Sequence, residues 1–138
     1  MDVVIDNIGR GILWTHIHRL GFLVVCVEFL TFSCTQKFGA EWKKWFSDSP
    51  MLVRKIMKNN FRTSLGVTAV IGGLHGLPIW LYILRHSSVY FSFSLPVACH
   101  LITIYGVIGR LLCLNAELWI IYRNLRELLA NDTASSIK

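Results

Sequence analysis

Three long stretches of mainly apolar residues divide the chain, at about 11–34, 65–84 and 89–109. Each approaches the roughly 20 apolar residues with which a helix crosses the hydrocarbon core of a bilayer. The first is less uniform, because residues 11–19 mix apolar and polar side chains, and we place these at the membrane–water interface. The pattern predicts an all-α integral membrane protein with three transmembrane helices, in a single membrane domain that covers residues 1–138.

The third apolar stretch continues past Arg110, where the sequence resumes as LLCLNAELWIIYRNL. One helix from Val89 to Leu125 would be about 55 Å long at 1.5 Å per residue, which is too long for a single crossing. We therefore expect one span followed by a helical extension over residues 110–128. Pro96 offers a site for a kink in this long helix.

A polar and basic stretch, 35–63, joins the first two apolar stretches. Its sequence EWKKWF places Trp42, Trp45 and Phe46 on one helical face, and aromatic side chains favour the membrane–water interface. Lysine and arginine residues gather here as well, and they are attracted to anionic lipid headgroups. We therefore expect residues 42–62 to contact anionic lipids.

The following segment, SDSPMLVRKIMKNNF, predicts a short amphipathic helix. Ser49 can cap its N-terminus, and Pro50 suits its first position. One face of this helix is apolar and the other is basic, with Leu52, Val53, Ile56 and Met57 on the first and Arg54, Lys55 and Lys58 on the second. This pattern is typical of a helix that lies on the membrane surface, and equally of one that docks on another subunit.

The distribution of basic residues predicts an orientation. Only RHSS separates the second and third stretches, so these two form an antiparallel hairpin. With three crossings, the 35–63 loop and the C-terminus lie on one side with most of the lysines and arginines, while Arg10, Arg19 and Arg85 lie on the other. The positive-inside rule then places the loop and the C-terminus in the cytoplasm, matrix or stroma.

Composition supports a membrane protein and narrows its partners. The chain is 54% hydrophobic and 16% charged, whereas soluble domains average about 25% charged residues. The formal net charge is +6, but the cations lie beside apolar runs, which favours lipid headgroups over nucleic acid. The four cysteines lie within or beside the apolar stretches without a Cys-x-x-Cys pair, so the usual spacing of a metal site is absent.

Two histidines lie deep in the apolar stretches. His75 is near the middle of the second and His100 near the middle of the third, so an antiparallel hairpin would hold them at similar depth. Imidazole is a common axial ligand of haem iron, and Gly72, Gly73 and Gly76 would leave room for a flat macrocycle beside His75. The alternative is that these small residues allow close helix packing and that both histidines are structural.

A polar group opens the first stretch, in the sequence THIHR. On a helix, Thr15, His18 and Arg19 would share one face. A hydroxyl, an imidazole and a guanidinium that converge at the interface can hold the carbonyl head of a quinone, with the guanidinium donating to a developing oxyanion. In the alternative interpretation, Arg19 simply extends to the lipid headgroups.

Three more charged residues lie in apolar surroundings: Glu28, Arg110 and Glu117. A carboxyl group in hydrocarbon is either protonated or paired with a cation. Arg110 and Glu117 are seven residues apart and share a helix face, whereas Glu28 has no obvious partner in its own stretch. We expect all three to contact other membrane subunits, and a proton-relay role for Glu28 is the less favoured alternative.

The sequence THIHRLG resembles the start of the first span in the large cytochrome b membrane-anchor subunit of succinate dehydrogenase, complex II, which typically carries Ser-x-x-His-Arg-x-x-Gly. Thr15 takes the place of the serine, His18 and Arg19 follow at the same spacing, and Gly21 comes one residue early. The resemblance implies ubiquinone at Thr15, His18 and Arg19, haem b on His75, and flavin and iron–sulfur partner subunits.

Two functions follow from these features. In the first, the chain is a complex II-like anchor of the mitochondrial inner membrane that contributes to haem b and ubiquinone binding, with its 35–63 loop and C-terminus on the matrix side. In the second, it is a non-catalytic accessory subunit of a respiratory complex. A small receptor or lipid-handling protein is a less favoured third. In the first two, the chain belongs to a hetero-oligomer and is not a self-contained enzyme, since it carries no hydrolytic triad or phosphate loop.

Overall fold

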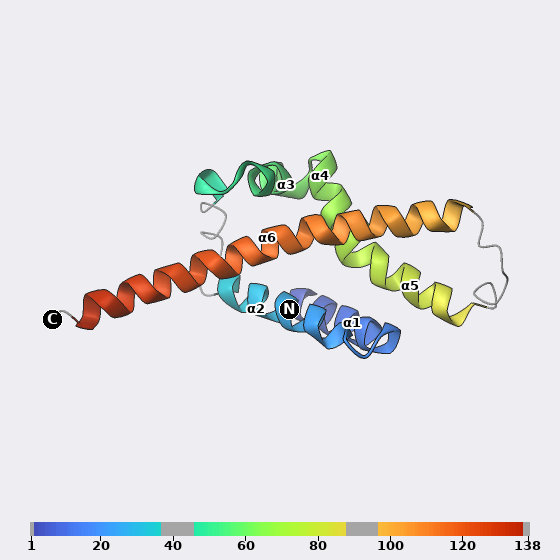
Figure 1. Ribbon diagram of the computed structural model, residues 1–138, viewed down its shortest axis with the longest axis horizontal. Coiled ribbons are helices and arrows are strands. Elements are labelled where there is room, and N and C mark those ends of the chain that lie inside the picture. The colour runs from blue at the N-terminus through green and yellow to red at the C-terminus, as the bar shows by residue number, and fades with distance from the viewer. Residues whose placement is uncertain (1, 37–45, 88–96, 137–138) are drawn as a thin grey trace.

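The computed structural model describes residues 2–36, 46–87 and 97–136, and within these ranges the chain is helical and contains no strand. The elements are α1 (Asp2–Ile17), α2 (Gly21–Gln36), α3 (Met51–Phe61), α4 (Ser64–Val67), the π-helix η2 (Thr68–Gly76), α5 (Leu77–His86) and α6 (Val97–Ser136). The prediction of an all-α fold is confirmed. Figure 1 shows α6 along the whole length of the molecule, with the shorter helices on its two sides.

Two helices are long and apolar enough to cross a membrane. One is Ser64–His86, in which α4, η2 and α5 follow end to end, and the other is the Val97–Ala130 part of α6. The first has 23 residues and is about 34 Å long, close to the roughly 30 Å of a hydrocarbon core. Only 28% and 22% of their most apolar windows are buried within the chain, so their outer faces present apolar side chains to the surroundings.

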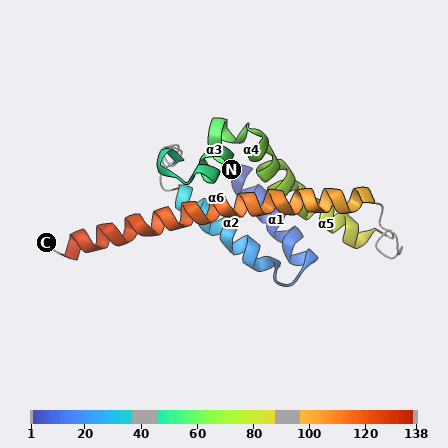
Figure 2. The ribbon, with the colours of Figure 1, turned by 45° about the horizontal axis from the view of Figure 1, so that its top comes forward.

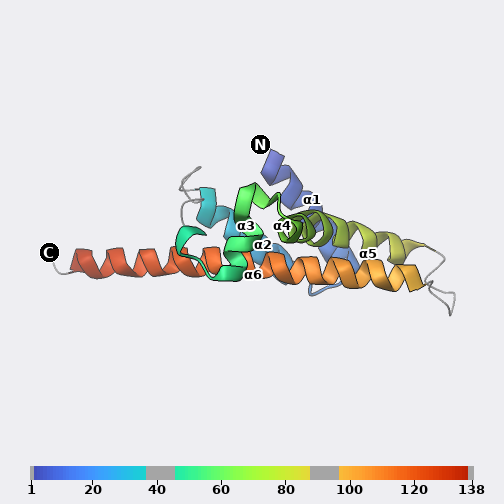
Figure 3. The ribbon, with the colours of Figure 1, turned by 90° about the horizontal axis from the view of Figure 1, so that it is seen from above.

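These two helices run antiparallel and side by side (Figure 3), as the short connection between them predicts. Trp80 donates its indole N–H to the hydroxyl of Thr103, with 3.0 Å between Nε1 and Oγ1. Further along, Gly73 lies so close to α6 that a Cβ there would overlap the backbone of Gly109 and Arg110. Such contact between small residues is a usual way for membrane helices to pack closely.

The first apolar stretch, 11–34, is not one helix, and three spans are therefore not shown. α1 ends at Ile17, α2 begins at Gly21, and the chain reverses between them (Figure 2). The amide of Gly21 donates to the carbonyl of His18 at 2.7 Å, and a Cβ on Gly21 would overlap the carbonyl of Trp14. Glycine thus permits a tight turn where apolar periodicity indicated a continuous span.

The α1–α2 hairpin packs against the hairpin of the two long helices. Each of its helices has 16 residues, or about 24 Å, and is shorter than a crossing. At the end of α5, the Arg85 guanidinium donates to the carbonyl of Ile17 and so caps the last turn of α1. The α1–α2 turn is therefore level with the end of α5, and the N-terminus of α1 and the end of α2 both lie towards α3.

α3 packs its apolar face on its own chain. Val53, Ile56 and Met57 are buried in a cluster that includes Ile120 of α6. The apolar face is therefore used within the molecule, in place of the expected docking on lipid or on another subunit, while the basic face is exposed. The predicted cap by Ser49 is wrong by one residue, because Pro50 occupies the N-cap position.

A left-handed turn ends α3. Asn59, Asn60 and Phe61 have φ values of 55°, 54° and 63°, in a region that asparagine enters more readily than other non-glycine residues. The turn leads directly into the first long helix, whose start is capped where the Thr63 hydroxyl accepts the amide of Gly66 at 3.1 Å.

α6 is one continuous helix of 40 residues, about 60 Å long. The extension expected at 110–128 is helical, and its C-terminal part projects beyond the other helices (Figure 1). The start of the expected third span, with Pro96, lies outside the described residues, as do the expected anchors Trp42 and Trp45.

Candidate functional site

Five polar side chains from three helices meet in the interior of the molecule. They are Asn7 and Arg10 of α1, Glu28 of α2, and Arg110 and Glu117 of α6, and we call them the buried charge cluster. None is more than 9% exposed. Each lies on the inward face of its helix, so the packing of the two hairpins brings them together.

The charges of the cluster alternate in sign and neutralise one another. Arg10 donates from Nε to Oε2 of Glu28 at 2.9 Å, and from its Nη2 to the side-chain oxygen of Asn7. Arg110 donates from Nη1 to Oε2 of Glu117 at 2.8 Å, and its Nη2 is 3.6 Å from Oε1 of Glu28. Two guanidinium groups and two carboxylates thus form a chain of ion pairs away from water.

Glu28, Arg110 and Glu117 are thus neutralised within their own chain, and the contacts with other subunits that the sequence suggested for them stay a prediction. Sequence reasoning also missed Arg10, which it placed on the outer side of the membrane. One signal could have found it: Asn7, Arg10 and Trp14 lie three and four residues apart, so they share the buried face of α1.

An apolar cleft of about 280 Å³ lies beside the buried charge cluster. Arg10, Glu28 and Glu117 border it on its polar side, and Phe32 and Leu74 are among its apolar walls. The cleft is therefore a mainly apolar space with charged groups along one border, and these charges are already paired with one another.

His75 and His100 are not brought together. His75 is half-buried, with Nδ1 3.4 Å from Nη1 of Arg10, whereas His100 is exposed. The pairing of Trp80 with Thr103 sets the register of the hairpin, which separates the two histidines by about eight residues, or about 12 Å along the axis. The expectation of similar depth is wrong, because it assumed a different register.

The glycines beside His75 are filled by neighbouring chain. A Cβ on Gly72 would meet the ring of Tyr105, and one on Gly73 would overlap the backbone of α6. A Cβ on Gly76 would lie 2.7 Å from the carbonyl oxygen of Ile71, in its own helix. In this structure the small residues serve close packing, and the space between η2 and α6 does not fit a haem.

Thr15, His18 and Arg19 are exposed and do not share a helix face, since α1 ends at Ile17. The Thr15 hydroxyl donates to carbonyls of its own helix at 3.0 and 2.9 Å. His18 accepts the amide of Leu20 on Nδ1 at 3.1 Å, within the turn. Thr15, His18 and Arg19 therefore belong to the α1–α2 connection, and their described hydrogen bonds are to nearby backbone.

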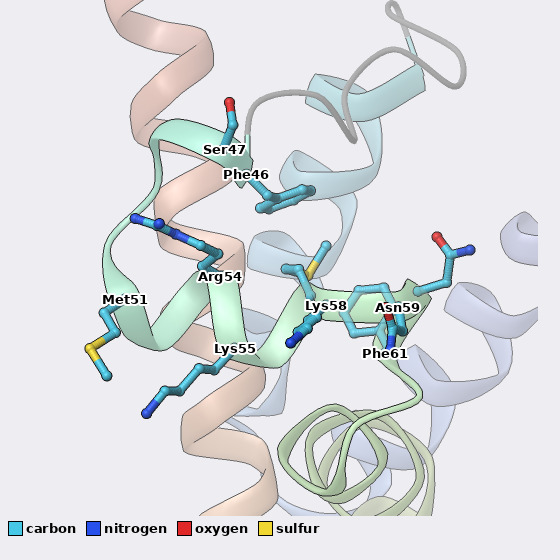
Figure 4. Close-up of a pocket in the computed structure, with 10 residues that line it drawn as sticks. Phe46, Ser47, Met51, Arg54, Lys55, Lys58, Asn59 and Phe61 are labelled. Carbon is cyan, nitrogen blue, oxygen red and sulfur yellow. The ribbon is translucent and has the colours of Figure 1, made fainter.

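A second candidate site is a basic hollow of about 780 Å³ on the outside of α3 (Figure 4). Its walls are Phe46, Ser47 and much of α3 with its left-handed turn, and the three cations Arg54, Lys55 and Lys58 lie along it. In the part of the chain that the structure describes, no carboxylate forms an ion pair with these cations.

Comparison with protein-family models, with curated proteins and with solved structures gives no match to this chain. The described residues include no group of three or more His, Cys, Asp or Glu side chains placed to hold a metal ion.

Proposed function

We propose that the chain is a non-catalytic, membrane-embedded subunit of a hetero-oligomeric complex, in the respiratory chain of the mitochondrial inner membrane. Two long apolar helices with exposed outer faces support a location in the membrane. The buried charge cluster is closed and internally neutral, which favours a structural role for it over a catalytic one.

One observation carries the proposal of a partner: an exposed apolar stripe that runs along α6 from the level of α3 into its projecting part. The stripe consists of Leu118, Tyr122, Leu125 and Leu129, each more than half exposed. Their spacing of four, three and four residues is that of a coiled-coil seam. Another face of the same helix is polar, with Arg123 paired to Glu127 at 3.0 Å.

The position of this stripe along α6 indicates that a partner protein, and not lipid, contacts it. The antiparallel register places Ser64, where the first long helix begins, close to the level of Leu118. Trp119 and Tyr122 lie at about the level of Ser64, and aromatic residues of this kind are typical of the membrane–water interface. Beyond them α6 extends into water, where leucines in a seam need a partner helix.

The distribution of charge supports an orientation. α1 and α2 form a hairpin, so the N-terminus lies on the same side as α3 and the C-terminus. Arg19 and Arg85 remain at the opposite end of the described structure. By the positive-inside rule, the basic side with α3 and the C-terminus faces the matrix.

The stripe can be tested by a double substitution, Leu125→Gln with Leu129→Gln. Tagged chains are extracted from native membranes in mild detergent, and the size of their complex is measured on native gels. We expect the double variant to insert in the membrane but to migrate as the free chain. The matched control Ala130→Gln alters an exposed position about 100° around the helix from Leu129 and should stay assembled.

The outcomes of this test are distinct. If the double variant keeps the full complex, the stripe is not the subunit contact and the proposal loses its main support. If a second, differently tagged copy of the chain is the whole of the bound protein, the complex is a homo-oligomer, which contradicts the hetero-oligomeric assignment.

The haem- and quinone-binding anchor is the competing function, and absorption spectroscopy separates the two. The accessory-subunit proposal predicts that His75→Ala leaves the spectrum of the assembled complex unchanged. Loss of a b-type Soret band on that substitution, with assembly intact, would favour the haem anchor instead. Likewise Arg19→Ala should not reduce quinone turnover in an assembled complex, because Arg19 lies in an exposed turn.

A further inference from the structure

We propose that the basic hollow on α3 binds the headgroup of an anionic phospholipid in the leaflet on the α3 side. This inference rests on the membrane location proposed above. It adds a defined site to that location, made of Arg54, Lys55 and Lys58 with the apolar side chains that border them.

The depth of the hollow is set by the helices that surround it. The first long helix begins at Ser64, three residues after α3 ends at Phe61. The buried face of α3 shares its cluster with Ile120, next to the aromatic pair Trp119 and Tyr122, whose rings are 5.8 Å apart. α3 therefore lies where both long helices leave the hydrocarbon, which is the depth of lipid headgroups.

The three cations of the hollow have no carboxylate as an ion-pair partner among the described residues. Arg54 and Lys58 are four residues apart, and Lys55 lies between them. Arg54 donates from Nη2 to the carbonyl of Ser49 at 3.1 Å, which holds its guanidinium beside the hollow and leaves further N–H groups to donate. Asp48, the nearby acid, accepts the hydroxyl of Ser47 at 3.1 Å. Three cations around one hollow are suited to a phosphodiester.

The apolar border distinguishes a lipid from a free phosphate ion. Phe46, Phe61 and Met51 line the same hollow as the cations, and Figure 4 shows the two rings on one side of α3 and the Met51 side chain pointing outward on the other. Met51 is 66% exposed, so apolar surface continues outward from the charged groups. A phospholipid satisfies both kinds of surface with its phosphate and its glycerol ester region, whereas an inorganic anion meets only the charges.

The experiment uses the full chain, purified in mild detergent and titrated with dioleoylphosphatidylglycerol against a background of phosphatidylcholine. Native mass spectrometry counts the anionic lipids that each chain retains. The test variant is Lys55→Gln with Lys58→Gln, which spares the bond from Arg54 to Ser49. The matched control is Arg19→Gln with Arg126→Gln, which removes two exposed cations elsewhere.

We expect the lysine double variant to bind phosphatidylglycerol about tenfold more weakly than the unaltered chain, because each cation near a membrane surface contributes appreciably to anionic lipid binding. The control should change less than about twofold. Equal weakening in both variants would show general charge attraction and overturn the site. Displacement of the lipid by inorganic phosphate at constant ionic strength would also overturn it, in favour of an anion site.

A separate experiment tests whether the chain is located in the membrane, on which the inference rests. The unaltered chain and both double variants are reconstituted with phosphatidylcholine alone and floated on a density gradient. All three should float with the vesicles. If all three chains float but the titration shows no preference for phosphatidylglycerol, the lipid site is wrong and the membrane location stands. If none of the three floats, the membrane location itself is wrong.

Discussion

Four charged side chains are buried in the chain at the cost of their hydration, and each has an ion-pair partner. Glu28 is the central member, since it lies between Arg10 at 2.9 Å and Arg110 at 3.6 Å. It joins α1 and α2 to α6. Buried ion pairs contribute little net stability compared with apolar packing, but the loss of one member leaves an uncompensated charge. The cluster therefore selects one arrangement of the two hairpins.

The substitution Glu28→Gln tests this role of the cluster. It preserves the shape of the side chain but leaves two guanidinium groups facing each other without their shared carboxylate. We expect a loss of about 3–5 kcal/mol in the free energy of unfolding, seen as a lower thermal midpoint in detergent. The control Glu127→Gln breaks an i,i+4 pair that is partly exposed and should cost no more than about 0.5 kcal/mol. Similar losses in both variants would contradict the central position of Glu28.

Sequence reasoning reached part of this cluster, and its limits are physical. The sequence placed Arg110 and Glu117 on one helix face, seven residues apart, and expected both to contact other subunits, whereas the structure joins them to each other at 2.8 Å. The partner of Glu28 is Arg10, 18 residues away, and it comes within reach only because the chain reverses at Gly21. A long-range pair of this kind depends on tertiary structure that periodicity does not report.

Among the elements, η2 and α6 cross with their backbones in direct contact. Gly73 and Gly109 face each other there, and each lacks the side chain that would separate the backbones. The π-helical η2 widens the helix over the same residues, Thr68–Gly76. The glycines that suggested room for a macrocycle therefore allow direct contact between two apolar helices.

Gly73→Ala should force this crossing apart, because the new methyl group would overlap the backbone of Gly109 and Arg110. We expect a destabilisation of about 1–3 kcal/mol, as for other overpacked sites. Gly9→Ala is the matched control: a Cβ on Gly9 meets nothing within 4 Å, and alanine favours a helix over glycine by up to about 1 kcal/mol. Thermal unfolding in detergent compares the two, and a stable Gly73→Ala variant would show that the helices do not touch there.

The boundaries of the helices could be predicted where an uninterrupted run of apolar residues defines the helix. The second apolar stretch, 65–84, corresponds to Ser64–His86, and the extension beyond Arg110 is helical. The break between Ile17 and Gly21 was missed because apolar residues continue on both sides of it. Its signal was Gly21, which comes shortly after the polar residues His18 and Arg19, and the hydrophobic pattern alone does not take this into account.

At the scale of the whole molecule, the two hairpins place both described ends of the chain on one side. α1 starts and α2 ends on the side of α3, and the two long helices likewise form one antiparallel pair. An odd number of crossings would separate the N-terminus from the C-terminus. In the proposed membrane topology, the turn at Gly21 therefore keeps both ends on one side.

This topology can be read by labelling single cysteines with a reagent that does not cross membranes, in a chain whose native cysteines are replaced by alanine. Val4→Cys and Ala130→Cys should react from the same side of sealed vesicles, and Arg19→Cys only from the other. The two ends share a side because α1 and α2 form a hairpin, and Arg19 lies in its turn. Labelling of Val4→Cys and Ala130→Cys from opposite sides would restore the three-span topology.

The uninterrupted α6 fixes a distance in the proposed complex. From Ile120 to Ser136 the helix continues for about 25 Å beyond the level at which the proposed topology places the membrane surface. A partner that binds its outer end is therefore held at a set height and at a set angle around the helix axis. One inserted residue would raise that end by only about 1.5 Å but turn it by about 100°, so an insertion would displace the partner mainly by rotation.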